Sequence, residues 1–84
     1  MMPFSVMWSD EALKRMATLE KADAARLRQK IIAASERPTH FLERMAGREE
    51  YRVRAGDYRA VVHVFETDKT LFVMTVGHRK NIYR

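Results

Sequence analysis

The spacing of apolar residues changes once along this chain, near Tyr51. Upstream of that point, two segments place apolar side chains three and four residues apart, which is the period of an amphipathic helix. The first segment is 10–20 and the second is 21–37, where Pro38 cannot continue the helix. Because the two segments adjoin, we expect an antiparallel helical hairpin.

Downstream of that change the period is two, which is typical of β-strands. Gly56-Asp57 and the segment 67–69 are typical of hairpin turns, and Gly77 is expected to end the last strand. The expected strands, including a short one before the helices, are 3–8, 51–55, 58–66 and 71–76. The order βααβββ predicts an α+β fold in which the helical hairpin packs on one face of a small, mainly antiparallel four-stranded sheet. Residues 1–84 are expected to form a single domain.

The composition is that of a folded globular domain, with 46% hydrophobic and 32% charged residues. The absence of cysteine excludes disulfides and thiolate metal sites and suits a reducing cytoplasm. No apolar run approaches the roughly 20 residues that a membrane span needs. The start of the sequence turns acidic too early for a secretion signal. We therefore expect a cytoplasmic protein that makes no use of a membrane.

Positive charge dominates the chain, with a formal net charge of +5. An arginine surplus favours polyanions, because each neutralised phosphate releases counterions. A basic surface can also serve solubility or bind an acidic protein partner. Net charge alone does not separate these possibilities.

Three arginines gather in the expected hairpin 51–66. Arg52 and Arg54 lie two residues apart and therefore share a face of their strand, and Arg59 on the next strand lies near them. A solvated sheet face is the alternative interpretation. Like charges across a strand pair repel, however, and no acid interleaves with them there, so we favour a phosphate-binding face.

Other kinds of site find little support in the sequence. The three glycines are isolated, which argues against a nucleotide cradle, and the three histidines lack metal-ligand spacing, so neither a metal nor a cofactor is expected. We interpret His63 as a packed histidine within a strand. His78 differs, because it lies beside Arg79 in a basic segment without acids. Tyr83 could fold back onto the core or stack on an unpaired base.

Two stretches in this order, YRVRAGDYRAVV (51–62) and VGHRKNIYR (76–84), resemble the RelE/ParE toxin superfamily, and the RelE branch in particular. The resemblance covers nearly the whole chain in architecture. It implies a RelE-like fold and a toxin that cleaves mRNA codons in the ribosomal A site as a ribosome-dependent endonuclease. It also implies a cognate antitoxin that holds this activity in check.

The resemblance assigns roles residue by residue. Arg59 and Arg79 match the arginines that stabilise the transition state, and Tyr83 matches a tyrosine that stacks on or helps to activate the substrate nucleotide. Arg52 and Arg54 match positions that are usually lysine in the RelE branch, and we expect them to bind substrate together with Lys80. Arginine does not readily give up a proton, so His78 or Tyr83 is the expected proton-transfer group.

Two other functions remain open at this point. A ParE-type toxin would share the fold and act on DNA gyrase, although the arginines and the late tyrosine argue against it. An inactive RelE-like module would bind RNA, the ribosome or an antitoxin without cleavage, and the two lysine-to-arginine departures leave room for it.

Overall fold

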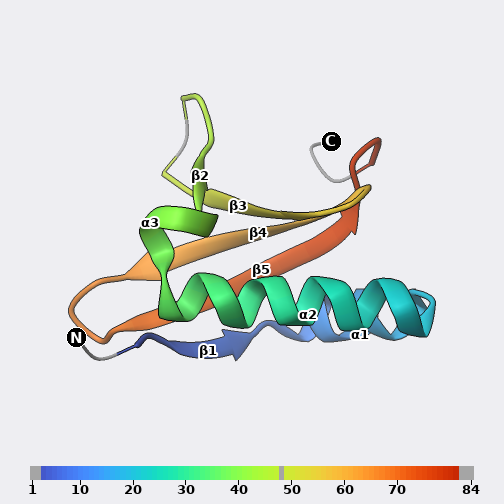
Figure 1. Ribbon diagram of the computed structural model, residues 1–84, viewed down its shortest axis with the longest axis horizontal. Coiled ribbons are helices and arrows are strands. Elements are labelled where there is room, and N and C mark those ends of the chain that lie inside the picture. The colour runs from blue at the N-terminus through green and yellow to red at the C-terminus, as the bar shows by residue number, and fades with distance from the viewer. Residues whose placement is uncertain (1–2, 48, 82–84) are drawn as a thin grey trace.

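The computed structural model describes residues 3–47 and 49–81 and contains a five-stranded sheet (Figure 1). The strands, in chain order, are β1 (Ser5–Trp8), β2 (Glu43–Arg44), β3 (Tyr51–Ala55), β4 (Tyr58–Phe65) and β5 (Thr70–His78). In space the order is β1-β5-β4-β3-β2. β1 runs parallel to β5, and the other neighbours are antiparallel. The α+β class predicted from the sequence is confirmed.

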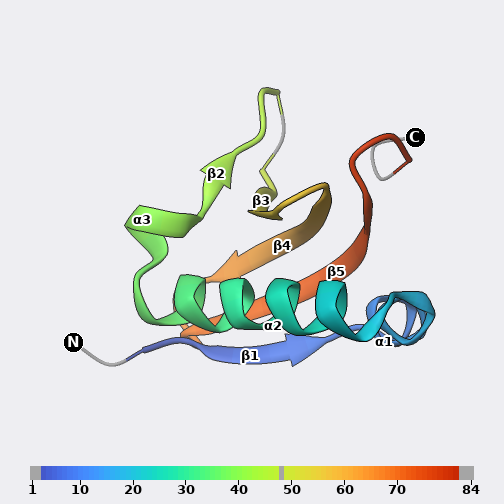
Figure 2. The same cartoon turned by 45° about the vertical axis from the view of Figure 1, so that its right-hand side comes forward.

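Three helices precede the strand β2: α1 (Asp10–Thr18), α2 (Lys21–Glu36) and α3 (Pro38–Phe41). Ser9 caps α1, because its hydroxyl oxygen accepts the backbone N–H of Ala12 at 3.0 Å. α2 ends at Glu36, and Pro38 then occupies the first turn of α3, where proline is tolerated. Figure 2 shows α2 lying across the sheet while α1 is seen almost end-on, so the two helices cross at a wide angle.

The core lies between the helices and one face of the sheet. Leu27 and Ile31 of α2 are fully buried against valines of the central strands, such as Val53 and Val62. Burial of these apolar side chains is what stabilises a chain of this size.

The opposite face of the sheet carries none of the described helices, and we call it the open face. Its larger side chains, which alternate with those of the core, are Met7, Arg52, Arg54, Arg59, His63, Phe65 and Phe72, and Val61 and Thr75 share this face. The alternation is interrupted once. Val61 pairs with Thr75 but Val62 pairs with Val73, so Met74 is an extra residue that forms a bulge in β5.

Four details differ from the sequence prediction. α1 and α2 cross at a wide angle and do not form the expected antiparallel hairpin (Figure 2). The sheet has a fifth strand, β2, which pairs with β3 and is only two residues long. The short helix α3 fills a segment for which no element was predicted. Gly77 does not end β5, because it pairs with Arg59 and the strand continues to His78, opposite Tyr58. β5 continues to His78 because β4 begins at Tyr58 and offers a pairing partner that far.

Candidate functional site

The predicted arginine cluster is present at one end of the open face. Arg54 lies directly opposite Arg59 in the β3–β4 pair, and Arg52 lies two residues further along β3. Val53 and Ala55, which alternate with these arginines, are buried on the helix side. The pairing therefore brings the three arginines together on the open face, where they face solvent.

Two of the arginines share one carboxylate. Glu43 Oε1 accepts a hydrogen bond from Arg52 Nε at 2.8 Å and lies 3.6 Å from Arg54 Nη1. Burial raises the pKa of Glu43, but the Arg52 hydrogen bond and the charges of Arg54 and Arg52 outweigh it and hold that pKa below its ordinary value of 4.5. The Glu43 carboxylate is thus an anion within the chain that pairs with both arginines.

Arg59 has a different environment. Its Nη1 donates to the carbonyl oxygens of Gly56 and Tyr58, each at 3.3 Å. Within residues 3–47 and 49–81, no carboxylate lies within ion-pair distance of Arg59. Its charge is therefore held in place by neutral groups and stays available to an external anion.

The end of β5 brings a further arginine to the β3–β4 turn. The backbone N–H of Arg79 donates to the carbonyl oxygen of Asp57 at 2.8 Å, and Arg79 Nε lies 3.7 Å from Asp57 Oδ1. Gly77, two residues earlier, pairs with Arg59. Arg59 and Arg79, which lie far apart in sequence, are thus held at the same end of the sheet.

His78 lies on the other side of β5. Its register partner is Tyr58, whose ring it meets edge-on with 5.5 Å between ring centroids. His78 Nδ1 accepts the backbone N–H of Lys80 at 3.2 Å, which assigns the proton of the neutral ring to Nε2. Lys80 itself is exposed in the following turn. Tyr83 lies outside the described residues.

A comparison with protein families places this chain. The family model described as the ParE toxin of the type II toxin–antitoxin system, parDE, matches residues 6–83. The chain belongs to this toxin family. The resemblance to the RelE/ParE superfamily is thereby confirmed. No curated protein sequence matches the toxin at a significant level.

Solved RelE structures share the fold of this toxin. The RelBE2 complex from Mycobacterium tuberculosis matches with a TM-score of 0.82 and 20% identity, over 96% of this chain and 97% of that one. The intact RelBE complex from E. coli matches with a TM-score of 0.78 and 22% identity, over 89% of this chain and 95% of that one. The RelE–RelB complex from Pyrococcus horikoshii matches with a TM-score of 0.75 and 25% identity, over 96% of this chain and 100% of that one. Each contains a RelE toxin with its RelB antitoxin.

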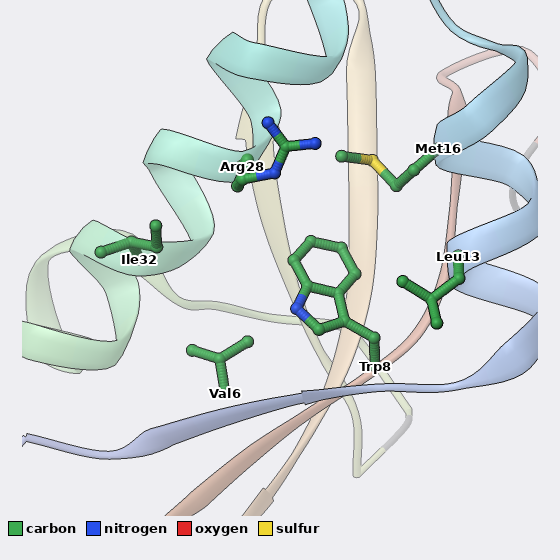
Figure 3. Close-up of a pocket in the computed structure, with 6 residues that line it drawn as sticks. All are labelled: Val6, Trp8, Leu13, Met16, Arg28 and Ile32. Carbon is green, nitrogen blue, oxygen red and sulfur yellow. The ribbon is translucent and has the colours of Figure 1, made fainter.

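An apolar cleft of about 300 Å³ lies on the helix side of the toxin, between α1 and α2 (Figure 3). Trp8 lies at its centre, with Leu13 of α1 on one side and Ile32 of α2 on the other. Leu13 and Ile32 are 53% and 45% exposed. Arg28 is the charged residue of its lining. The cleft is separated from the arginine cluster by the sheet.

Sequence reasoning missed Glu43 and Asp57, the two carboxylates that contact the predicted arginines. The sequence marks Asp57 only as a turn residue, and Glu43 lies in a segment without a predicted element. Neither residue carries a sequence signal for these contacts, because the contacts depend on strand register. Among the described residues there is no group of three or more side chains that could hold a metal ion. None of the helices in those ranges combines the length and hydropathy needed to span a bilayer.

Proposed function

We propose that this toxin is a ribosome-dependent endoribonuclease that cleaves mRNA codons in the A site of cytoplasmic ribosomes. The observation that carries the proposal is the position of Arg59. It lies opposite Arg54 on an uncovered face, has no carboxylate partner among the described residues, and has Arg79 at the same end of the sheet.

The chemistry of RNA cleavage suits these side chains. The nucleophile is the 2′-hydroxyl beside the scissile phosphate, so the protein must align the nucleotide and stabilise a pentavalent phosphorane. A guanidinium remains charged and offers two parallel donors to phosphate oxygens. Fixed donors aimed at developing charge supply a large part of many rate enhancements. Arg59 and Arg79 take this role, and Arg52, Arg54 and Lys80 position the substrate.

Proton transfer is assigned to His78 or Tyr83. The hydrogen bond to Nδ1 leaves the neutral His78 ring with its proton on Nε2, so that nitrogen has no free lone pair to take the 2′-proton. The ring also lies beside Tyr58, on the opposite side of β5 from Arg59. The arginines therefore carry this proposal, and the base role falls to Tyr83.

An antitoxin is the proposed partner that keeps the toxin inactive. The similar RelE toxins were solved in complex with RelB antitoxins. An acidic, amphipathic antitoxin segment suits both the net charge of +5 and the apolar cleft with Arg28 in its lining.

Ribosome-programmed mRNA cleavage tests the proposal directly. We expect Arg59→Ala to lower the cleavage rate about 10²–10³-fold, as loss of one oxyanion donor does elsewhere. Arg15→Ala is the matched control, because Arg15 is an exposed arginine of α1 far from the cluster. Equal cleavage by the Arg59→Ala and Arg15→Ala proteins would refute the role of Arg59.

The family model favours a second candidate, because its description is that of a ParE toxin. A ParE-type toxin would inhibit DNA gyrase through protein contacts. A supercoiling assay with purified gyrase separates the two: inhibition without mRNA cleavage supports the ParE activity. If induction of the toxin neither arrests growth nor cleaves mRNA, a binding module without catalysis is the remaining function.

A further inference from the structure

Aromatic side chains occupy the end of the open face that is remote from the arginines. His63 and Phe65 of β4 stack with 4.6 Å between ring centroids and 20° between ring planes. Phe72 of β5 lies directly opposite His63. We call these three residues the aromatic patch. The neighbouring Met7 of β1 pairs with Phe72 and is 56% exposed.

The aromatic patch takes no part in the core. The residues that alternate with it, Val62, Leu71 and Val73, are fully buried on the helix side. Phe65 is 44% exposed, and no described helix lies above it. His63 and Phe72 are half-buried. Aromatic side chains that stay partly exposed forfeit part of the free energy that burial would give, so a patch of them on a flat sheet suggests a ligand.

Charge on the same face selects the ligand class. Arg59 and His63 are four residues apart on β4, which is about 13 Å along a strand. A short stretch of extended single-stranded RNA can cover that distance, with phosphates at the arginines and bases at the rings. Stacking on aromatic side chains of an open sheet is a frequent way to hold unpaired bases, and it tolerates different sequences.

We infer that the aromatic patch is a base-stacking subsite for single-stranded RNA, placed on the open face beside the arginine cluster. The inference rests on the proposed endoribonuclease function and extends it. The arginines hold the phosphate that is cut, and His63, Phe65 and Phe72 hold bases of the same strand outside the cleaved position. The patch acts in binding and touches no reacting atom.

Two probes separate stacking from charge. One is a short single-stranded 2′-O-methyl RNA, which lacks the attacking hydroxyl and stays intact. The other is an abasic oligonucleotide with the same number of phosphates. We expect the full-length toxin to bind the base-bearing probe about tenfold more tightly than the abasic one, since one stacked base contributes about 1–3 kcal/mol.

Variants then assign the preference to the patch. We expect His63→Ala/Phe65→Ala to lose most of the preference for bases while its affinity for the abasic probe stays unchanged. Phe65→Trp retains a ring and should retain the preference. Arg59→Ala should lower the affinity for both probes by the same factor. Leu13→Ala, in the cleft on the helix side, is the apolar control and should change the affinity for neither probe.

The outcomes are distinguishable. If the toxin cleaves mRNA but binds both probes equally, or if the double variant binds as the wild type does, the stacking subsite is refuted and the endoribonuclease stands. If the double variant loses antitoxin affinity and keeps its preference for bases, the patch is a protein contact and the inference is also refuted. If the wild type neither cleaves mRNA nor binds either probe, both proposals fall.

Discussion

The open face of the sheet and the cleft between α1 and α2 both expose large apolar side chains, but their surroundings differ. Phe65 and Met7 share a face with three arginines, whereas Leu13 and Ile32 line an apolar hollow with one arginine. A flat basic face with rings suits an extended polyanion, and a hollow suits apolar side chains of a protein segment. The residues around an exposed apolar group therefore indicate its ligand better than the exposure itself.

The largest expected effect tests whether the open face needs arginine or only positive charge. Arg59→Lys keeps the charge but loses the planar fork, so we expect cleavage about 10²-fold slower with little change in RNA affinity. Single-turnover cleavage on programmed ribosomes measures the rate. Arg15→Lys on α1 serves as the control. A fully active Arg59→Lys protein would mean that charge alone is sufficient.

A charge placed in the cleft should lower the affinity for the antitoxin and leave the affinity for RNA unchanged. Ile32→Asp puts a carboxylate into an apolar hollow, and we expect antitoxin affinity to fall at least about tenfold, as at other interface centres. Calorimetric titration of antitoxin into the toxin measures this. Phe65→Asp on the open face is the matched control and should leave antitoxin affinity intact. Equal losses from both variants would show that one partner covers both surfaces.

Removing the internal anion of the arginine cluster should strengthen RNA binding. Glu43→Gln removes the negative charge that Arg52 and Arg54 share, so we expect a severalfold, at most about tenfold, gain in affinity for an uncleavable single-stranded RNA. Glu11→Gln makes the same change in net charge on α1, where Glu11 contacts Arg15. A similar gain from Glu11→Gln would trace the effect to net charge and not to the cluster.

The smallest effect concerns stability and pH. The fold lowers the pKa of Glu43 below 4.5, so its contacts stabilise the toxin above that pH and lose their contribution as the pH falls through the lowered pKa. Because the pair is exposed, the contribution should stay under about 1 kcal/mol. Urea unfolding should show Glu43→Gln less stable than wild type near neutrality, with the difference vanishing in acid. A difference that persists in acid would refute this role of the ionised carboxylate.

Local patterns were sufficient to predict the principal helices, the four longer strands and the face shared by Arg52 and Arg54. Each of these depends on a period of two or of 3.6 residues. β2 was missed because two residues are too short to show a period, and its place depends on pairing with β3. Glu43 reaches the arginines only through that pairing. The position of His78 beside Tyr58 likewise required the full length of β4 and β5.

The bulge at Met74 acts as a phase shift between two parts of one strand. Thr75 and Gly77 share the open face with Arg59, and after one extra residue Phe72 shares that face while Leu71 and Val73 enter the core. Phe72 and Thr75 are three residues apart, so a regular strand would place them on opposite faces, and the bulge that takes up Met74 keeps both on the open face. The basic and aromatic ends of the open face therefore coexist on β5 because the bulge takes up one residue between them.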